Sequence, residues 1–194
     1  MPPSSNFVYN NRETLEGYTS GLKIKEYLGS GCWGSVFSSD NDRWVIKLTT
    51  DHEEDQAAHV VMELRKTDKL SLPGLVEVLS SKMVSALEED GETIYVIVRE
   101  RITPIKKLPM DSEIIQDLDD ALYAIEEKFA HTKEEIDKAF MVLDKHAPHL
   151  MKAINQMLSR GHSLIDLAPQ NIGVTLRPRL GIPKGSIVLF DLSF

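Results

Sequence analysis

The spacing of apolar and polar positions divides the chain into two parts. Between residues 22 and 99, short apolar segments alternate with turns that contain Gly, Asp and Asn, which is typical of β-strands. Residues 53–69 instead carry apolar residues at helical spacing. We therefore expect a five-stranded antiparallel sheet with one helix, with strands at 22–28, 35–38, 44–49, 75–87 and 93–99.

After Pro104 the apolar spacing becomes mostly helical. Thr132 and Glu135 have the spacing of a capping box, which indicates the start of a helix. Pro148 is expected to interrupt that helix, and Gly161 is expected to end the next one as a left-handed cap. The apolar stripes of these predicted helices lie at 114–129, 136–143 and 150–158, and two last strands are expected at 172–176 and 186–190.

These elements predict an α+β fold with two lobes and a hinge near residues 100–104. Residues 1–20 contain two Pro and little periodic apolar content, so we interpret them as an N-terminal arm that is either irregular or held by a neighbouring surface. Residues 21–100 form the first predicted lobe, and residues 101–194 form a second, mostly helical lobe.

Composition excludes several classes of function. The chain has 194 residues with 22 Lys and Arg against 30 Asp and Glu, a net charge of -8 that disfavours binding to duplex nucleic acid. Its longest apolar run, 94–98, is far shorter than a membrane span, and residues 1–20 lack the features of a signal peptide. The single Cys allows no internal disulfide. We expect a soluble, cytoplasmic protein without a membrane partner.

A glycine-rich turn between two predicted strands is the first candidate for chemistry. Residues 29–36 spell G-x-G-x-x-G-x-V, with Gly29, Gly31 and Gly34 at the three glycine positions. Such glycines let backbone N–H groups approach a polyanion, although an ordinary hairpin also uses glycines. A dinucleotide-binding turn is disfavoured because Val36 continues as a strand rather than opening a helix.

Lys47 follows in an otherwise apolar strand, thirteen positions after Gly34. A lysine beside glycine-loop amides would meet phosphate oxygens, whereas a lysine at a strand end that only reaches solvent is the ordinary alternative. A carboxylate is needed to fix the lysine, and we expect Glu63 of the following helix to supply it. We expect Glu53 and Glu54 at an exposed first turn, where they favour the helix dipole.

Three further polar residues follow the helical part. Asp166 and Asn171 lie five positions apart in a predicted loop before a strand, and Asp191 ends the last strand. An Asp on such a loop can accept a proton from an incoming hydroxyl, and the Asn amide oxygen can bind a metal ion. Asp191 would add a carboxylate ligand for Mg²⁺. Each residue by itself is also explained by the preference of Asp and Asn for loops.

In this order along the chain, the motifs resemble those of the eukaryotic-type protein kinases over residues 22–194. Residues 29–36 are similar to the glycine-rich loop, 45–47 to the V-A-I-K strand, 72–76 to the H-P-N-I-V segment and 97–102 to the strand that leads into the hinge. Residues 164–171 stand for H-R-D-L-x-x-x-N, and 191–193 for D-F-G.

The resemblance implies a kinase-like fold that binds ATP and Mg²⁺ and transfers a phosphoryl group to Ser or Thr hydroxyls of proteins. Lys47, oriented by Glu63, would hold the phosphates, Asp166 would accept the hydroxyl proton, and Asn171 and Asp191 would bind Mg²⁺. The nucleotide would lie against the glycine loop and an adenine site, whose predicted residues are Gly29, Gly31, Gly34, Val36, Val45, Glu100, Ile102 and either Ile172 or Val174.

Departures from the kinase pattern point to a compact subfamily and leave two alternatives open. Leu164 and Ile165 replace His and Arg, Ala168 stands where Ser/Thr kinases carry Lys, and the sequence ends three residues after Asp191. Compact phage-encoded kinases are similar in their trimmed second lobe, which implies host proteins as substrates. The apolar surface that such trimming exposes favours a homodimer. A catalytically inactive kinase-like binding module and a small-molecule phosphotransferase are the alternatives.

Overall fold

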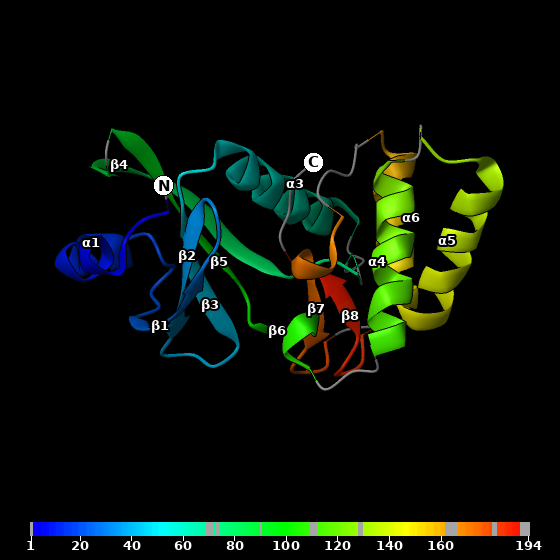
Figure 1. Cartoon of the computed structure of the whole chain (residues 1–194). Coiled ribbons are helices and arrows are strands. Elements are labelled where there is room, and N and C mark those ends of the chain that lie inside the picture. Colours follow the sequence, from blue (N-terminus) through cyan, green and yellow to red (C-terminus); the bar gives the residue numbers. More distant parts are fainter. Residues whose placement is uncertain are drawn as a thin grey trace. The chain divides into compact units, whose positions relative to one another are not determined.

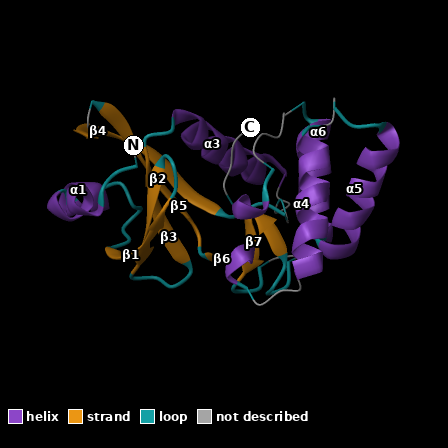
Figure 2. Ribbon diagram, in the orientation of Figure 1, coloured by secondary structure: helices purple, strands orange, loops and turns teal. Residues whose placement is uncertain are grey.

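The computed structural model describes residues 2–68, 72, 74–89, 91–108, 112–127, 130–161, 167–179 and 182–190. It shows an α+β protein, as expected (Figures 1 and 2). The chain divides into two compact units, which are described separately. The first unit comprises Met1–Thr67 and Glu77–Arg101, and the second comprises Asp68–Val76 and Ile102–Phe194.

The first unit contains the predicted five-stranded antiparallel sheet. Each strand pairs with its neighbours in antiparallel register, and the order across the sheet is β1-β2-β3-β5-β4. Along the chain, the long helix α3 lies between β3 and the edge strand β4. In the sheet, β5 lies between these two strands. The bounds are β1 Ile24–Ser30, β2 Gly34–Ser39, β3 Trp44–Thr49, α3 His52–Asp68, β4 Val78–Glu89 and β5 Glu92–Glu100.

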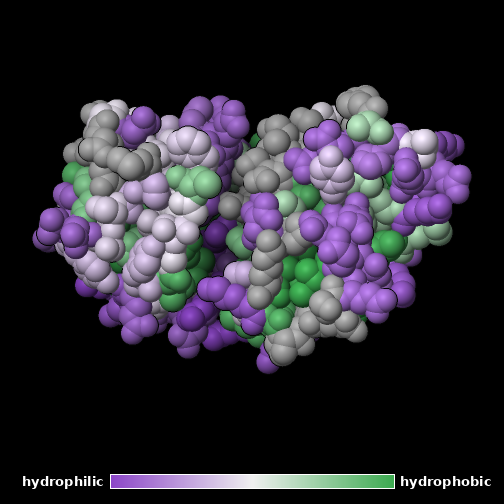
Figure 3. Space-filling view, viewed as in Figure 1, coloured by the Kyte–Doolittle hydropathy of each residue, from purple (hydrophilic) through white to green (hydrophobic). Residues whose placement is uncertain are grey.

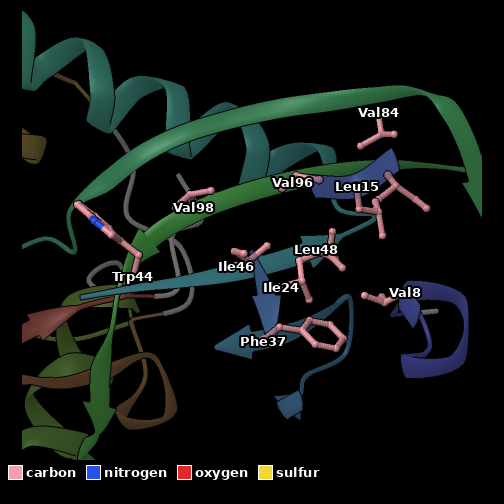
Figure 4. Close-up of a cluster of buried hydrophobic side chains, with 11 residues drawn as sticks. Val8, Leu15, Ile24, Phe37, Trp44, Ile46, Leu48, Val84, Val96 and Val98 are labelled. Carbon is pink, nitrogen blue, oxygen red and sulfur yellow. The ribbon is translucent and has the colours of Figure 1, made fainter. Parts of the chain in front are cut away.

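The N-terminal arm is helical and packs against the sheet, so the irregular alternative was wrong and the alternative of an arm held by a neighbouring surface agrees with the structure. It forms α1 (Ser5–Asn10) and α2 (Arg12–Glu16), and the Ser4 side chain caps α1 by accepting a hydrogen bond from Phe7 N–H at 3.1 Å. Helices this short depend on packing for their stability. Val8 and Leu15 provide that packing, because both are fully buried in the core against one face of the sheet (Figure 4).

The alternation of side chains along each strand places the hydrophobic core on one face of the sheet. Every second residue of β2, β3 and β5 points into it, which follows from the period of two along a strand. The cluster consists of Val8, Leu15, Ile24, Phe37, Trp44, Ile46, Leu48, Val84, Ile94, Val96 and Val98. The remaining residues of these strands, among them Val36 and Lys47, which are cross-strand partners, belong to the opposite face. Contacts from the first turn of α3 reach that face, as described below.

The described residues of the second unit contain three α-helices: α4 (Ser112–Glu126), α5 (Lys133–His146) and α6 (Pro148–Ser159). The capping box of Thr132 and Glu135 is confirmed, with both reciprocal hydrogen bonds present. Pro148 begins α6 rather than only interrupting α5, because a proline lacks the N–H that the first turn of a helix leaves unpaired. Gly161 follows α6 with φ +80°, as expected for a left-handed cap. Hydrophilic residues dominate the outer side of these helices in Figure 3.

The second unit also holds a small antiparallel sheet in the order β6-β7-β8. Its strands are β6 (Ile102–Pro104), β7 (Ile172–Thr175) and β8 (Ile187–Leu189), and short 3₁₀ turns lie at Ile105–Lys107 and Pro169–Asn171. Strand β6 was not predicted, since three residues that end in Pro carry too little pattern. Gly173 of β7 has no room for a side chain, because a Cβ atom there would lie 2.6 Å from the Thr103 carbonyl oxygen of β6.

The segment before β4 belongs to the second unit. Leu75 forms a parallel bridge with Leu189, so the strand predicted from residue 75 begins only at Val78. Val76 N–H donates to Leu189 O and Leu189 N–H donates to Gly74 O, each at 2.8 Å. A Cβ atom on Gly74 would come within 2.2 Å of the carbonyl oxygen of His149, at the start of α6. The glycine is therefore required for this close backbone contact.

No helix in the described part of the chain has both the length and the apolar character needed to cross a membrane.

Candidate functional site

The glycine-rich segment forms the hairpin between β1 and β2, with Gly29 opposite Val36. Gly29 has φ +152°, a backbone conformation that L side chains rarely adopt. Trp33, at the tip, is 59% exposed, but its carbonyl oxygen accepts hydrogen bonds from the Thr49 hydroxyl and from Thr50 N–H, each at 3.1 Å. These bonds fasten the tip of the hairpin to the end of β3.

The side chain of Lys47 lies directly against the third glycine of this hairpin. A Cβ atom on Gly34 would be 2.8 Å from Lys47 Cε and 3.0 Å from the carbonyl oxygen of Leu48. Real Cβ contacts are not this short, so any larger residue at position 34 would displace the lysine. The structure thus brings together Gly34, Val36 and Lys47, as the sequence predicted for a phosphate-binding hairpin, and Val45 adds a buried side chain two positions before the lysine.

Glu54, and not Glu63, is the carboxylate that pairs with Lys47. The Lys47 ammonium forms an ion pair with Glu54, and their side chains are only 9% and 7% exposed. Glu63 has a side chain that is 65% exposed and lies 3.5 Å from Lys66 Nζ. The expected Lys47–Glu63 pairing was therefore wrong, and so was the expectation that Glu54 is exposed.

The connection between β3 and α3 explains this difference. Only Thr50 and Asp51 separate the strand from the helix, and Asp51 caps it by accepting a hydrogen bond from Glu53 N–H at 2.9 Å. The first turn of α3 therefore lies beside the end of the strand that carries Lys47. Glu63 comes nine residues after Glu54, which displaces it by about 13 Å along the helix axis. The Asp at position 51, read as a helix cap, was the sequence signal that could have identified Glu54.

A second buried carboxylate in the first turn of α3 was missed by the sequence analysis. Asp55 accepts a hydrogen bond from the Ser81 hydroxyl of β4 at 2.5 Å, and His59 Nε2 lies 3.6 Å from the same carboxylate. Burial raises the pKa of Tyr95, and the charge of Asp55 raises it further. Glu54 and Asp55 together connect α3 to two different strands of the sheet.

Glu77 connects the other end of α3 to the sheet. Its carboxylate accepts hydrogen bonds from Arg43 at 2.7 Å and from Arg65 at 2.8 Å. Burial opposes ionisation of Glu77, but the hydrogen bonds and charges of Arg65 and then Arg43 lower its pKa overall. The Glu77 carbonyl oxygen also accepts a hydrogen bond from Glu100 N–H at 2.7 Å.

The backbone N–H groups of residues 100 and 101, beside the predicted adenine site, both have partners within the first unit. Glu100 N–H is used by Glu77, as just described, and Arg101 N–H donates to the carbonyl oxygen of Arg43 at 2.8 Å. The Glu100 side chain is also buried. The N–H groups of residues 100 and 101 are thus used within the first unit, and contact of Glu100 and Ile102 with adenine stays a prediction.

In the second unit, Asn171 is 4% exposed and ends the turn before β7. Its backbone carbonyl oxygen accepts a hydrogen bond from Phe190 N–H at 2.8 Å, and Ile172 pairs with Leu189. The chain around Asn171 thus lies beside the chain that leads to position 191. Ile172 is fully buried, whereas Ile102 and Val174 are half-buried. Asp166 and Asp191 lie outside the described residues.

A separate hollow of about 600 Å³ opens on the first unit. Its lining is polar and includes charges of both signs, and no predicted site residue takes part in it. The lining residues are Tyr9, Arg12, Lys25, Glu26, Ser38, Ser39, Asp42 and Arg101.

Comparison with known proteins adds no assignment, because no family model matches the chain and no curated protein matches it.

Proposed function

We propose that this chain is an ATP- and Mg²⁺-dependent protein kinase that transfers the γ-phosphoryl group to Ser or Thr hydroxyls of proteins. The observation that carries the proposal is the position of Lys47, whose side chain lies against Gly34 of the glycine-rich hairpin and whose ammonium pairs with Glu54.

Lys47 is buried together with the carboxylate of Glu54. Burying an ammonium group costs free energy unless a carboxylate compensates its charge, and even a compensated pair is weak evidence for stability. The position of this buried pair beside a glycine-rich hairpin therefore calls for an explanation other than stability. Phosphoryl transfer provides one, because it requires a fixed cation beside backbone N–H groups that can cradle phosphate oxygens. Glu54 would hold the lysine in place, and Gly34 leaves the space that its side chain occupies.

The order of elements in the first unit also supports the proposal. A five-stranded antiparallel sheet with one helix between its third and fourth strands is the arrangement that the kinase resemblance implies for the lobe that binds the nucleotide. Val36 and Val45 flank Lys47 on its own face of the sheet, where the resemblance implies apolar cover for adenine.

The second unit supplies the proposed Mg²⁺ ligands. The hydrogen bond between Phe190 N–H and Asn171 O brings the residue before Asp191 beside Asn171. An Asn amide oxygen and an Asp carboxylate fit the preference of Mg²⁺ for oxygen ligands, and the bound ion would neutralise phosphate charge. Asp166 would orient the acceptor hydroxyl and take its proton.

Incubation of the purified chain with radiolabelled ATP and Mg²⁺ tests the proposal. We expect label on the chain itself or on proteins of an added lysate, and loss of the label in Asp166→Asn, with circular dichroism to show that the variant folds. Binding of Mg·ATP without any transfer would instead support the inactive module. Transfer that requires a low-molecular-weight acceptor would support the small-molecule phosphotransferase.

A further inference from the structure

We propose that Ser35 and Glu16 are positioning residues through which the N-terminal arm holds the glycine-rich hairpin, so that nucleotide affinity depends on the arm. Here the arm means residues 2–20. The inference rests on the proposed nucleotide site, and it names the part of the chain that sets the geometry of that site.

The arm is attached to the second strand of the hairpin through Ser35. The Ser35 hydroxyl donates a hydrogen bond to the carbonyl oxygen of Pro3 at 2.6 Å, and Ser35 is only 2% exposed. Ser35 follows Gly34 directly, and strand alternation turns its side chain away from the face that carries Lys47. The arm therefore contacts β2 on one face of the sheet, and Lys47 lies on the opposite face.

The arm is attached to the first strand of the hairpin through Glu16. Its carboxylate accepts hydrogen bonds from Ile24 N–H, at the start of β1, and from Lys23 Nζ, each at 2.9 Å. Arg12 adds a third donor at 3.2 Å. Burial opposes ionisation of Glu16, but the bonds from Lys23, Ile24 and Arg12 lower its pKa overall, so the carboxylate is charged at neutral pH.

Apolar contacts join these two attachments. Val8 and Leu15 of the arm share the core with Phe37 of β2. The rings of Tyr9 and Tyr27 pack edge-on against Phe37, with centroids 6.5 and 5.6 Å away. Both strands of the hairpin thus have polar and apolar links to the arm, whereas the carbonyl oxygen of Trp33 at the tip accepts hydrogen bonds from Thr49 and Thr50. A shift of the arm would move the base of the hairpin and, with it, Gly34.

Two matched pairs of variants in the full-length chain test this inference. Ser35→Ala removes the bond to the arm, and its control is Ser39→Ala on the same face of β2, where the hydroxyl bonds to Asn41 and Trp44 instead. Glu16→Ala removes the acceptor for Ile24, and its control is Glu13→Ala on an exposed position of α2. The measurements are the Kd of a fluorescent ATP analogue with Mg²⁺ and amide hydrogen exchange over residues 29–36.

We expect Ser35→Ala and Glu16→Ala to weaken nucleotide binding about fivefold or more, the factor that one net hydrogen bond contributes. Exchange over residues 29–36 should become faster in both, while both controls match the wild type. A merely structural role would lower the affinity of Ser35→Ala and Ser39→Ala in proportion to their loss of stability, and that result would overturn the inference. Failure of the wild type to bind Mg·ATP would reject the proposed function instead, and the exchange data would still decide whether the arm holds the hairpin.

Discussion

Lys47 forms a buried ion pair with Glu54 of the first turn of α3, and the same lysine side chain packs against Gly34. This relationship places an ammonium group at the glycine-rich hairpin and makes it depend on two neighbours. The hairpin determines the space that the lysine occupies, and the helix supplies its counter-charge. Changes at either neighbour should therefore act through the lysine.

Glu54→Gln should lower the stability of the fold and weaken binding of Mg·ATP, while Glu63→Gln should change neither quantity. The first variant removes the charge of Glu54 from its buried pair with Lys47, and removing one member of such a pair costs about 3 kcal/mol or more. The second alters a side chain that is 65% exposed on the same helix. Urea unfolding and the Kd for Mg·ATP, measured for both, test the assignment. Equal effects of the two variants would show that Glu54 has no special role.

Gly34→Ala should displace Lys47, whereas Gly31→Ala should not change stability. The added Cβ would lie 2.8 Å from Lys47 Cε, but at position 31 it would meet nothing within 4 Å. Because the first effect acts through the lysine, combining Gly34→Ala with Glu54→Gln should cost less than the sum of the single changes. A double-mutant cycle on unfolding free energies measures this, and strict additivity would contradict it.

Glu77→Gln should destabilise the first unit more at neutral pH than in acid. The folded-state pKa of Glu77 is lowered from 4.5, so its ionisation stabilises the fold above that pH. The contribution is lost as the pH falls through the folded-state pKa. Charged hydrogen bonds contribute roughly 1.5 to 3 kcal/mol, which sets the expected loss at pH 7. Urea unfolding should show a larger difference from wild type at pH 7 than at pH 3, with Glu92→Gln, at an exposed residue of β5, as the control.

Gly74→Ala should destabilise the second unit more than Gly161→Ala does. A Cβ atom at position 74 would lie 2.2 Å from the backbone oxygen of His149 and 2.4 Å from Leu150 Cα, so backbone must move. Such overpacking costs about 1 to 3 kcal/mol or more. At Gly161 the space is open, and only the φ of +80° penalises Ala, by roughly 1 to 2 kcal/mol. Thermal unfolding followed by circular dichroism should rank the two variants in this order.

Local patterns predicted the regular elements well. The apolar segment at 44–49 coincides with β3, and the Thr132–Glu135 spacing gave a capping box that the structure confirms. Both signals act over a few residues, through strand periodicity and through hydrogen bonds to the nearest turn. The arm was missed because helices of five or six residues carry almost no periodic signal and depend on burial of Val8 and Leu15.

The sequence by itself determined which residue types are available for chemistry and where most of the strands and helices lie, since residue type and local spacing are properties of the chain alone. Only the tertiary structure decided the partners. Whether Lys47 meets Glu54 or Glu63, and whether Ser35 bonds to Pro3, depends on the lengths of the connections and on the packing of α3 and the arm against the sheet. Contacts between residues distant along the chain follow from that packing, and no local spacing specifies them.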